Sequence, residues 1–478
     1  MPRASAPVAS VPRWWTSPRL LVVLFVLSLP AVTSRIYASD EVQYFSYLRS
    51  IWFDHDVSFE NEYQHFYDAG IAASPGFHET FLERTTETGR RINFGTIGAA
   101  LLWAPFYAVA DFVTRLLNSA GRPVAADGYS KPYVAAVAYA SAFYGWLALY
   151  LSARLVERLA RSWPALGSRG VVSAVIVWLG TPLLFYMYVA PPMSHATSAF
   201  AVTLFVTLWI AVRDRWDVRG VALLGGSAAL MAMVREQDAF FVAGPIVDMA
   251  WTLARANRER VAPMLLAAAA GVAAAVVAFL PQALAYLALN GRVGPSRLVA
   301  RKMSWSAPHA LEVVASPAHG LFFWTPLAVV ALVGLVVLAR RFPPPMRALG
   351  IGLLLAAACQ VYVAGSVESW TVAGAFGQRR FVSLTPLLVF GVAAVLAVLH
   401  ERRWATPAAA VLLAATIWWN IALIVQFGTG LMDRQRLELS RIAYNTFVVV
   451  PRALPGLAWR YLFDRASFYE SAQSLRGR

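Results

Sequence analysis

Cysteine and lysine are nearly absent from this chain, and each absence excludes a class of site. Cys359 is the only cysteine among 478 residues, so no disulfide can form within the chain and no cysteine-based metal site can be built. Lys131 and Lys302 are the only lysines, so arginine supplies almost all of the positive charge behind the net charge of +15. We also find no glycine-rich nucleotide-binding motif and no clear internal repeat. The missing repeat argues against transporters that are built from inverted halves.

Charge of either sign is scarce, and this scarcity determines the class of protein. Only 14% of the residues are charged and 59% are hydrophobic, whereas a soluble domain carries about 25% charged residues. We therefore expect an all-α polytopic membrane protein. Positive charge in such a protein marks cytoplasmic loops and contacts with anionic lipid, so we expect no nucleic-acid partner.

Apolar runs separated by charged loops predict the membrane helices. Several are close to the lower length limit for crossing ~30 Å of hydrocarbon. The runs fall at 20–37, 94–117, 132–153, 171–190, 195–212, 219–234, 239–254, 261–289, 319–339, 348–365, 382–400 and 406–426.

Five arginine-dense loops give the orientation of these runs, because such loops stay in the cytoplasm. All five loops fall on the same side of the membrane as the N-terminus only if the run 94–117 does not cross the membrane. That run contains Pro105 together with Asp111 and Arg115, and charged residues are unusual in a membrane span. We predict an in-plane or re-entrant helix there, about eleven spans, a cytoplasmic N-terminus and an external C-terminus. The alternative is that 94–117 crosses and a further half-helix restores the parity. The five loops are 154–169, 213–219, 254–260, 340–347 and the pair 402–403.

The spans divide the chain into three parts without a soluble linker. We expect a membrane module at 1–289 with a first external loop at 38–93, then an external loop and the last spans at 290–426, and an external segment at 427–478. Basic residues on the external side form a predicted collar around a cavity, which suits a phosphate-bearing ligand. Any one of them could instead be an ion pair or a solvated charge. The collar comprises Arg84, Arg90, Arg91, Arg235, Arg292, Arg297, Arg301, Lys302, Arg379 and Arg380.

Two adjacent acids, Asp40 and Glu41, follow the first apolar run directly. A carboxylate in hydrocarbon costs free energy, so a carboxylate at a membrane boundary indicates a functional or structural role. Tyr44, Tyr47 and Leu48 then recur at helical spacing, which predicts an amphipathic surface helix with the acids at its N-terminal end. One acid could act there as a general base. The structural alternative is that Ser39 or Asp40 caps the helix, and the two roles are compatible.

The pattern Asp-Glu-x-x-Tyr directly after a first membrane helix resembles the GT-C superfamily of polyprenyl-phosphate-sugar glycosyltransferases. It is most similar to the branch that holds the protein O-mannosyltransferases and the bacterial aminoarabinose transferase of lipid A. The resemblance covers most of 20–400, but only Asp-Glu-x-x-Tyr is fairly specific. The lipid A branch often has thirteen spans, whereas about eleven are predicted here. The resemblance therefore does not identify the acceptor. Further similar segments are 93–98, 105–107, 191–195, 234–238, 319–326 and 370–380.

The resemblance implies roles for individual residues. Asp40 would be the catalytic base and Glu41 a helper or structural acid. Metal and cofactor are not expected, since no cluster of ligand-type residues has clear spacing. Arg235, Arg379 and Arg380 would bind the donor phosphate, and Tyr44, His195, His319 and Trp370 would contact substrate.

Each of these assignments has a structural alternative. Arg235 could instead pair with Glu236 or Asp238, or extend from a helix end towards the membrane boundary. His195 could be a hydrogen-bonded histidine at a helix end. Trp370 could belong to an interfacial aromatic belt.

Together these observations predict an inverting membrane glycosyltransferase that moves a monosaccharide from polyprenyl (undecaprenyl) phosphate to an extracytoplasmic acceptor. The sugar stays open, and the acceptor could be a protein, a lipid or a glycan. Rival functions are a transporter or flippase of lipid-linked glycans, which predicts charges in mid-span, and a polysaccharide ligase, which predicts a large late external loop. The arginine-heavy, alanine-rich composition favours a bacterial inner membrane, with the site facing the periplasm or exterior.

Overall fold

The described residues form a helical bundle with a smaller helical layer at one end. The computed structural model describes residues 17–72, 74–401 and 405–468. Within these ranges there is no β-strand, only two isolated bridges. Seven of the described helices are long and apolar enough to cross a membrane, and three shorter ones are apolar. The expectation of an all-α polytopic membrane protein is therefore confirmed.

Each apolar run predicted as a span is helical over most of its length. The first and last ones shift by a few residues, and the run 171–190 is divided between two helices. The helices of the bundle are α1 (Pro18–Ser28), α6 (Lys131–Leu159), α7 (Arg169–Gly180), α8 (Leu183–Tyr188), α9 (His195–Val212), α10 (Val218–Val234), α11 (Ala243–Leu253), α12 (Arg258–Asn290), α16 (Leu327–Arg341), α17 (Arg347–Ser366), α18 (Thr385–Glu401) and α19 (Thr406–Thr429).

Shorter helices gather outside the bundle. They are α2 (Ser39–Arg49), α3 (Glu60–Asp68), α4 (Pro75–Phe77), α13 (Arg297–Arg301), α14 (Ala310–Ala315), α15 (Leu321–Trp324), α20 (Leu439–Tyr444) and α21 (Val450–Phe463).

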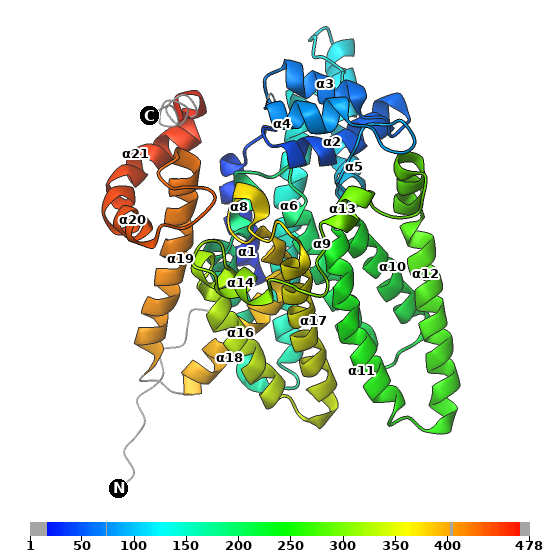
Figure 1. Cartoon of the computed structure of the whole chain (residues 1–478). Helices are drawn as coiled ribbons and strands as arrows, with labels where there is room; N and C mark the ends of the chain where they lie inside the picture. The colour runs from blue at the N-terminus through cyan, green and yellow to red at the C-terminus, as the bar shows by residue number, and fades with distance from the viewer. Residues whose placement is uncertain (1–16, 73, 402–404, 469–478) are drawn as a thin grey trace.

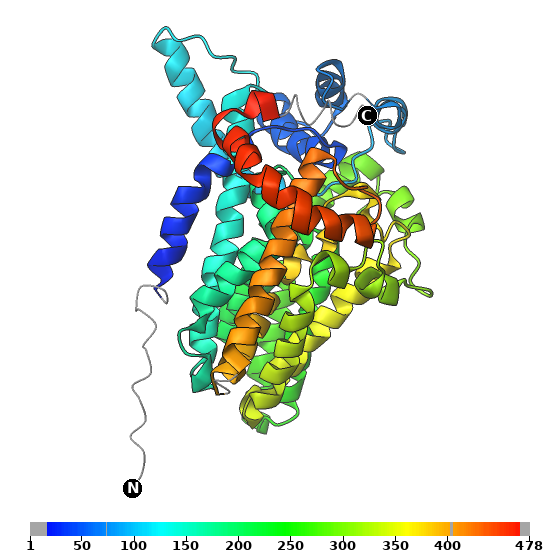
Figure 2. The same cartoon turned by 90° about the vertical axis from the view of Figure 1, so that its left-hand side faces the viewer.

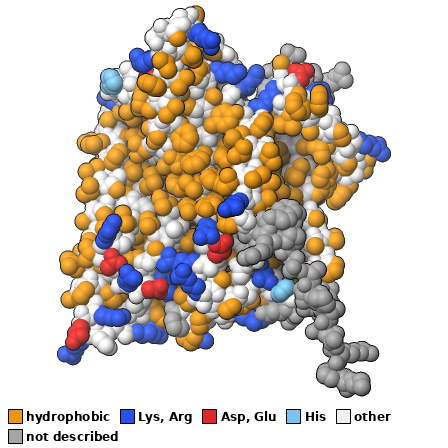
Figure 3. Space-filling model, turned by 180° about the vertical axis from the view of Figure 1, so that it is seen from behind, with side chains coloured by type: hydrophobic (Ala, Val, Ile, Leu, Met, Phe, Trp, Pro, Cys, Tyr) orange, Lys and Arg blue, Asp and Glu red, His pale blue; other side chains and the backbone are white. Residues whose placement is uncertain are grey.

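The two ends of the bundle differ in what they carry. The arginine-rich turns α11–α12 and α16–α17 lie at the lower end of Figure 1, and the helices of the first loop lie at the upper end with α21. Seen from behind, apolar side chains fill a band across the middle of the molecule, with charged side chains above and below it (Figure 3). This arrangement agrees with the predicted orientation. The predicted basic pair 402–403 lies outside the described residues.

The run 94–117 forms α5 (Gly98–Ser119), and both of its ends lie at the upper end of the bundle. Figure 2 shows α5 projecting there, above α1. The loop after it returns to the first loop, because the backbone carbonyl of Asp127 accepts from Arg49 and the ring of Tyr129 stacks on His65 at 3.8 Å. These contacts keep the loop after α5 beside the first loop, although α5 is long and apolar enough to cross a membrane.

Glycines let two pairs of long helices touch through their backbones. A Cβ on Gly225 of α10 would lie 1.9 Å from the carbonyl oxygen of Gly271 on α12. A Cβ on Gly334 of α16 would lie equally close to the carbonyl oxygen of Gly391 on α18. Small residues at such crossings are typical of membrane helices, whose association depends on close packing.

Helix α2 carries the two acids, and the prediction of a surface helix was wrong for it. Both its apolar Phe45 and Tyr47 and its polar Gln43 and Ser46 are buried, because α3 and α5 pack over it. The capping alternative was also wrong, since the N-cap residue is Ala38 and neither Ser39 nor Asp40 caps the helix.

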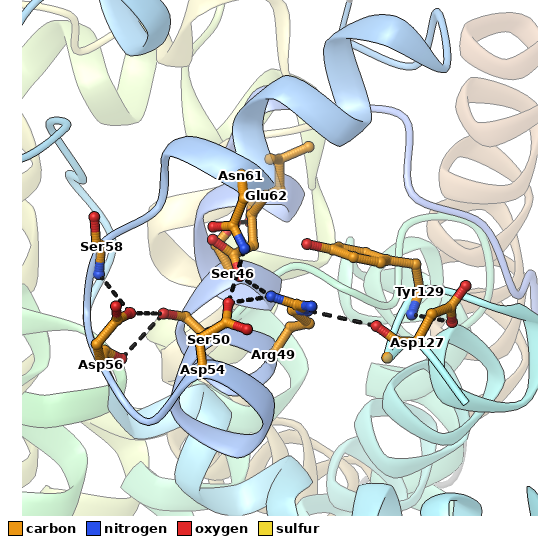
Figure 4. Close-up of polar contacts among 12 residues, drawn as sticks. Ser46, Arg49, Ser50, Asp54, Asp56, Ser58, Asn61, Glu62, Asp127 and Tyr129 are labelled. Carbon is orange, nitrogen blue, oxygen red and sulfur yellow. Dashed lines mark hydrogen bonds and ion pairs between the residues drawn. The ribbon is translucent and has the colours of Figure 1, made fainter. Parts of the chain in front are cut away.

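Arg49 fixes the C-terminal end of α2 (Figure 4). Its guanidinium donates to Glu62 Oε1 at 3.0 Å and to Asp54, and it lies over the ring of Tyr129 at 4.7 Å. The Glu62 side chain is fully buried, and this burial raises the pKa of its carboxyl to about 7 although Arg49 opposes the shift. The contacts tie α2, α3 and the loop after α5 into one unit, so the position of α2 depends on all three.

Candidate functional site

Asp40 forms an ion pair with Arg379, which lies 339 positions later in the chain. Asp40 Oδ2 accepts from Arg379 Nη1 at 2.6 Å. Arg379 begins the short helical turn Arg379–Leu384 that leads into α18, and the two glycines before it, Gly374 and Gly377, have φ of 75° and 61°. The Asp40 side chain remains 38% exposed and the Arg379 side chain 18%. The acid predicted as the base is thus open to a ligand and held by a predicted phosphate-binding arginine.

Glu41 faces the opposite way. Its side chain is fully buried, and its Oε2 accepts from the backbone N–H groups of Tyr37 at 2.8 Å and Ala38 at 3.1 Å. Burial raises the pKa of this carboxyl to about 8. These contacts fix the chain just before Asp40, so the position of Glu41 fits the expected structural acid rather than a group that meets substrate.

Arg235 and His195, which the sequence assigned to donor phosphate and to substrate, lie in contact with each other. Arg235 Nη1 donates to His195 Nδ1 at 2.8 Å, which assigns the histidine proton to Nε2, and Arg235 Nη2 donates to Gln237 Oε1 at 3.2 Å. The proposed ion pair of Arg235 was wrong, because Glu236 accepts from Tyr286 and Asp238 accepts from Ser198.

The guanidinium of Arg235 also has spare hydrogen-bonding capacity. Arg235 Nε is buried and has no hydrogen-bond partner among the described residues. A buried N–H of a charged group is costly to leave unpaired. The group can therefore donate to a bound anion without breaking a contact that it already makes.

Arg380 is linked to Arg235 through an amide side chain. Gln237 Nε2 donates to the carbonyl oxygen of Arg380 at 2.7 Å. Arg380 Nη1 in turn donates to the carbonyl oxygens of Ser369 at 2.9 Å and Trp370 at 3.3 Å. The two arginines therefore hold each other's positions through Gln237.

His319 and Trp370 stabilise the turn that carries Arg379 and Arg380, and neither is among the residues that line the large cavity near α19 and α21. Gln378 Nε2 donates to both of their carbonyl oxygens, at 3.1 and 2.9 Å. The His319 imidazole is fully buried, contacts Trp324 and bonds the carbonyl of Gly377. These contacts favour a structural role for His319 over a contact with substrate.

Tyr44 meets the segment 93–97, and that segment connects α2 to the end of α10. The ring of Tyr44 lies against Gly95, while Asn93 Nδ2 donates to the carbonyl of Gln43 at 3.0 Å. Thr96 Oγ1 donates to the carbonyl of Val234, the residue before Arg235, at 3.0 Å. The part of the sequence that resembles the family thus joins the helix of Asp40 to Arg235.

The arginines give the site an excess of positive charge. The charges of Arg235, Arg379 and Arg380 all act on the imidazole of His195. Of the three, Arg379 alone forms an ion pair with Asp40 in the described part of the chain. Clustered guanidinium groups bind phosphate through charge-assisted hydrogen bonds. Among the described residues, no group of three or more histidine, cysteine or acidic side chains could hold a metal ion.

Two sets of residues can be distinguished within the predicted collar. Arg84, Arg91 and Arg297 form exposed ion pairs with Glu79, Glu60 and Glu87, which is the ordinary explanation for a surface charge. Only the set from 235 and 379–380 converges near Asp40.

Sequence reasoning missed the neutral side chains that organise the site. Gln43, Gln237 and Gln378 each bond backbone groups of another segment, and Tyr186 bonds the carbonyl of Phe376 at 2.8 Å. No charge or spacing marks a glutamine for such a position.

No protein-family model matches this chain, and no curated protein shows significant similarity to it. The likeness to GT-C enzymes therefore rests on the residues described above.

Proposed function

We propose that this protein is a membrane glycosyltransferase of the GT-C type, with about eleven spans, that uses a polyprenyl phosphate monosaccharide as donor. The observation that supports this most strongly is the contact between Asp40 and Arg379. It joins the early acid that the resemblance names as the base to the late arginines that it names as the phosphate site. No local pattern in the sequence predicts that these two segments contact each other.

The proposed reaction is a single displacement with inversion. The acceptor hydroxyl gives its proton to Asp40, and its oxygen forms a bond to the anomeric carbon. The bond between that carbon and the phosphate oxygen breaks, and the polyprenyl phosphate leaves with the electron pair. Its phosphate changes from one negative charge to two, so Arg235, Arg379 and Arg380 stabilise the charge that develops in the transition state.

A transporter is less well supported by the positions of buried charge. The Arg213–Asp248 pair is buried within the bundle, with Nε to Oδ2 at 2.8 Å, but Arg213 directly follows α9 at the end away from α2. Its contacts with Trp209 and Asp248 are those of a fixed structural pair. The Arg213–Asp248 pair therefore does not form, together with Asp40, a continuous polar path across the bundle for a transported ligand.

The decisive experiment replaces Asp40 by asparagine in the purified full-length chain. We expect Asp40→Asn to fold and to bind polyprenyl phosphate, because Ala38 and Glu41 rather than Asp40 organise the start of α2. Transfer from synthetic polyprenyl phosphate sugars should fall by ~100-fold or more, the usual scale for loss of a general base.

The matched control is Asp68→Asn, which neutralises an acid at the end of α3 whose carboxylate accepts from Gln64 at 2.7 Å. It should leave transfer unchanged. An active Asp40→Asn enzyme would remove Asp40 as the base. Failure of the wild-type protein to bind any polyprenyl phosphate would overturn the proposed function itself.

A further inference from the structure

A large cavity lies beside the segment that leads into Asp40 and beside the residues 374–376 that precede Arg379. Its volume is about 1030 Å³, and its walls come from the segment after α1 and from α8, α19 and α21. Figure 2 shows α19 with α20 and α21 crossing this upper end of the bundle. Most of the wall is apolar, and includes Ile36, Val134, Phe185, Val189, Phe376, Ile424, Val425, Phe427, Leu454 and Leu457.

The polar part of the cavity is basic. Arg35, Lys131 and Arg434 line it, and an adjoining cavity of about 360 Å³ shares the first two and adds Arg465. No aspartate or glutamate is among the described residues that line either cavity. Such a surface is complementary to an anion.

Two of these cations form no ion pair with a carboxylate of the described residues. The guanidinium of Arg465 donates to the backbone carbonyls of Pro30, Val32 and Tyr461, which are neutral partners. Lys131 forms no ion pair with any described residue, and it is one of only two lysines in the chain. Their charges are therefore available to a ligand.

Helix α21 shows that the cavity lies at a lipid boundary. Its inward side chains, Leu454 and Leu457, line the cavity, while Trp459 and Phe463 on its outer side are 65% and 69% exposed. A helix with apolar side chains both inward and outward, and with tryptophan at its surface, is typical of a segment in the membrane interface. A ligand that enters beside it would carry apolar chains.

We propose that this cavity binds an anionic lipid whose headgroup hydroxyl is the acceptor of the transfer, an inference that rests on the proposed function. The cavity wall includes Tyr37 and Ala38, which lie three and two positions before Asp40, and Met193, whose sulfur lies 4.0 Å from Arg379 Nη1. Arg235, Arg379 and Arg380 are not among the lining residues. We therefore assign the donor phosphate to these arginines and the second lipid to the cavity.

The test measures binding of phosphatidylglycerol, which has both an anionic phosphate and free hydroxyls, to the purified full-length protein, with phosphatidylcholine as the neutral comparison. Lys131→Gln removes a cation, and we expect it to weaken phosphatidylglycerol binding about tenfold or more, since hydrogen bonds to charged groups are among the stronger ones. Leu457→Trp fills the apolar part and should weaken binding similarly.

The controls are Arg122→Gln, an exposed charge in the loop 121–130, and Leu462→Trp on the outer side of α21, and both should bind as wild type. Equal binding of the two lipids by wild type, or unchanged binding by both cavity variants, would overturn the anionic-lipid site.

Binding of polyprenyl phosphate to the same variants separates this proposal from the donor site. We expect it to stay within about twofold of wild type for Lys131→Gln and Leu457→Trp, because the donor arginines lie outside the cavity. A parallel loss would make the cavity part of the donor site and overturn the acceptor assignment. If Asp40→Asn keeps full transfer while the cavity variants lose phosphatidylglycerol, the catalytic assignment fails and the lipid site remains.

Discussion

Asp40 and Glu41 are adjacent in sequence but have opposite environments. A helical turn rotates successive side chains by about 100°, so neighbours in the first turn of α2 cannot face the same way. Asp40 meets Arg379 and remains partly exposed, whereas Glu41 turns back to the backbone of Tyr37 and Ala38. One carboxylate can therefore react with a ligand while the other maintains the geometry.

The pKa of Glu41 predicts a pH dependence of stability. Burial raises this pKa from 4.5 to about 8, so the native state binds the proton more tightly than the unfolded state. The resulting stabilisation is fully present below pH 4.5 and is lost as the pH rises to about 8, at on the order of 1 kcal/mol per pH unit. Glu41→Gln keeps an acceptor for the two N–H groups and cannot ionise.

We therefore expect Glu41→Gln to gain stability over wild type as the pH rises from 5 to 8, measured by thermal unfolding at several pH values. Transfer by this variant should fall less than transfer by Asp40→Asn. Parallel unfolding curves for both proteins at every pH would show that Glu41 is not titrating in this range.

Donor binding should depend on the arginines of the candidate site. Arg379→Ala or Arg235→Ala removes a charge-assisted contact worth ~1.5–3 kcal/mol, so polyprenyl phosphate binding should weaken roughly 10- to 150-fold and transfer should fall with it. Lysine at either position should restore binding only in part, because an ammonium cannot bind a phosphate bidentately.

Arg84→Ala is the matched control, since Arg84 pairs with Glu79 on the exposed surface of the first loop. Wild-type affinity in all three variants of Arg235, Arg379 and Arg380 would exclude them as the phosphate site.

At the scale of elements, contacts with the first loop fix the position of α2. The segment 93–97 holds its middle through Gln43, and Arg49 holds its C-terminal end. The side chain of Glu62 is fully buried, so its charge depends on Arg49. The orientation of Asp40 is thus set by contacts along the whole helix.

Removing Arg49 should destabilise this unit. Arg49→Met leaves Glu62 buried without its partner, a change that typically costs about 3–5 kcal/mol. Part of that loss should be recovered at pH 5, because Glu62, with a pKa already near 7, becomes protonated. Thermal unfolding and proteolysis of the first loop would measure the effect.

The double variant Arg49→Met/Glu62→Leu should be more stable than Arg49→Met alone, because no buried charge remains. If the single and double variants unfold alike, the Arg49–Glu62 pair does not hold the first loop.

At the scale of the whole molecule, the basic loops and the first loop lie at opposite ends, so the orientation can be tested by cysteine labelling. In a Cys359→Ala background, we expect cysteines placed in the arginine-dense loops, at 160, 215, 257 and 344, to react only from the cytoplasmic side. Cysteines at 70, 125, 305, 372 and 460 should react from outside.

Position 125 is the decisive one for α5. The structure puts the loop 121–130 in contact with Arg49 and His65 of the first loop, so positions 70 and 125 must share a side. Cytoplasmic labelling at 125 with external labelling at 70 would make α5 a true span and contradict the eleven-span arrangement.

The sequence by itself determined the class of the protein and the positions of its helices. Hydropathy is a local property, so each apolar run predicted as a span could be read without knowing its neighbours, and the arginine-dense loops predicted an orientation that labelling can test. The acids and arginines of the candidate site were also visible, because charge next to an apolar run is rare enough to be noticed.

Only the tertiary structure decided which of these charges meet. Asp40 and Arg379 are 339 positions apart, and nothing local in either segment states that they touch. The same holds for the burial of α2 on both faces, for the glutamines that bond backbone groups, and for the cavity under α21. Each of these depends on packing between distant segments, and packing is a property of the folded chain rather than of any stretch of it.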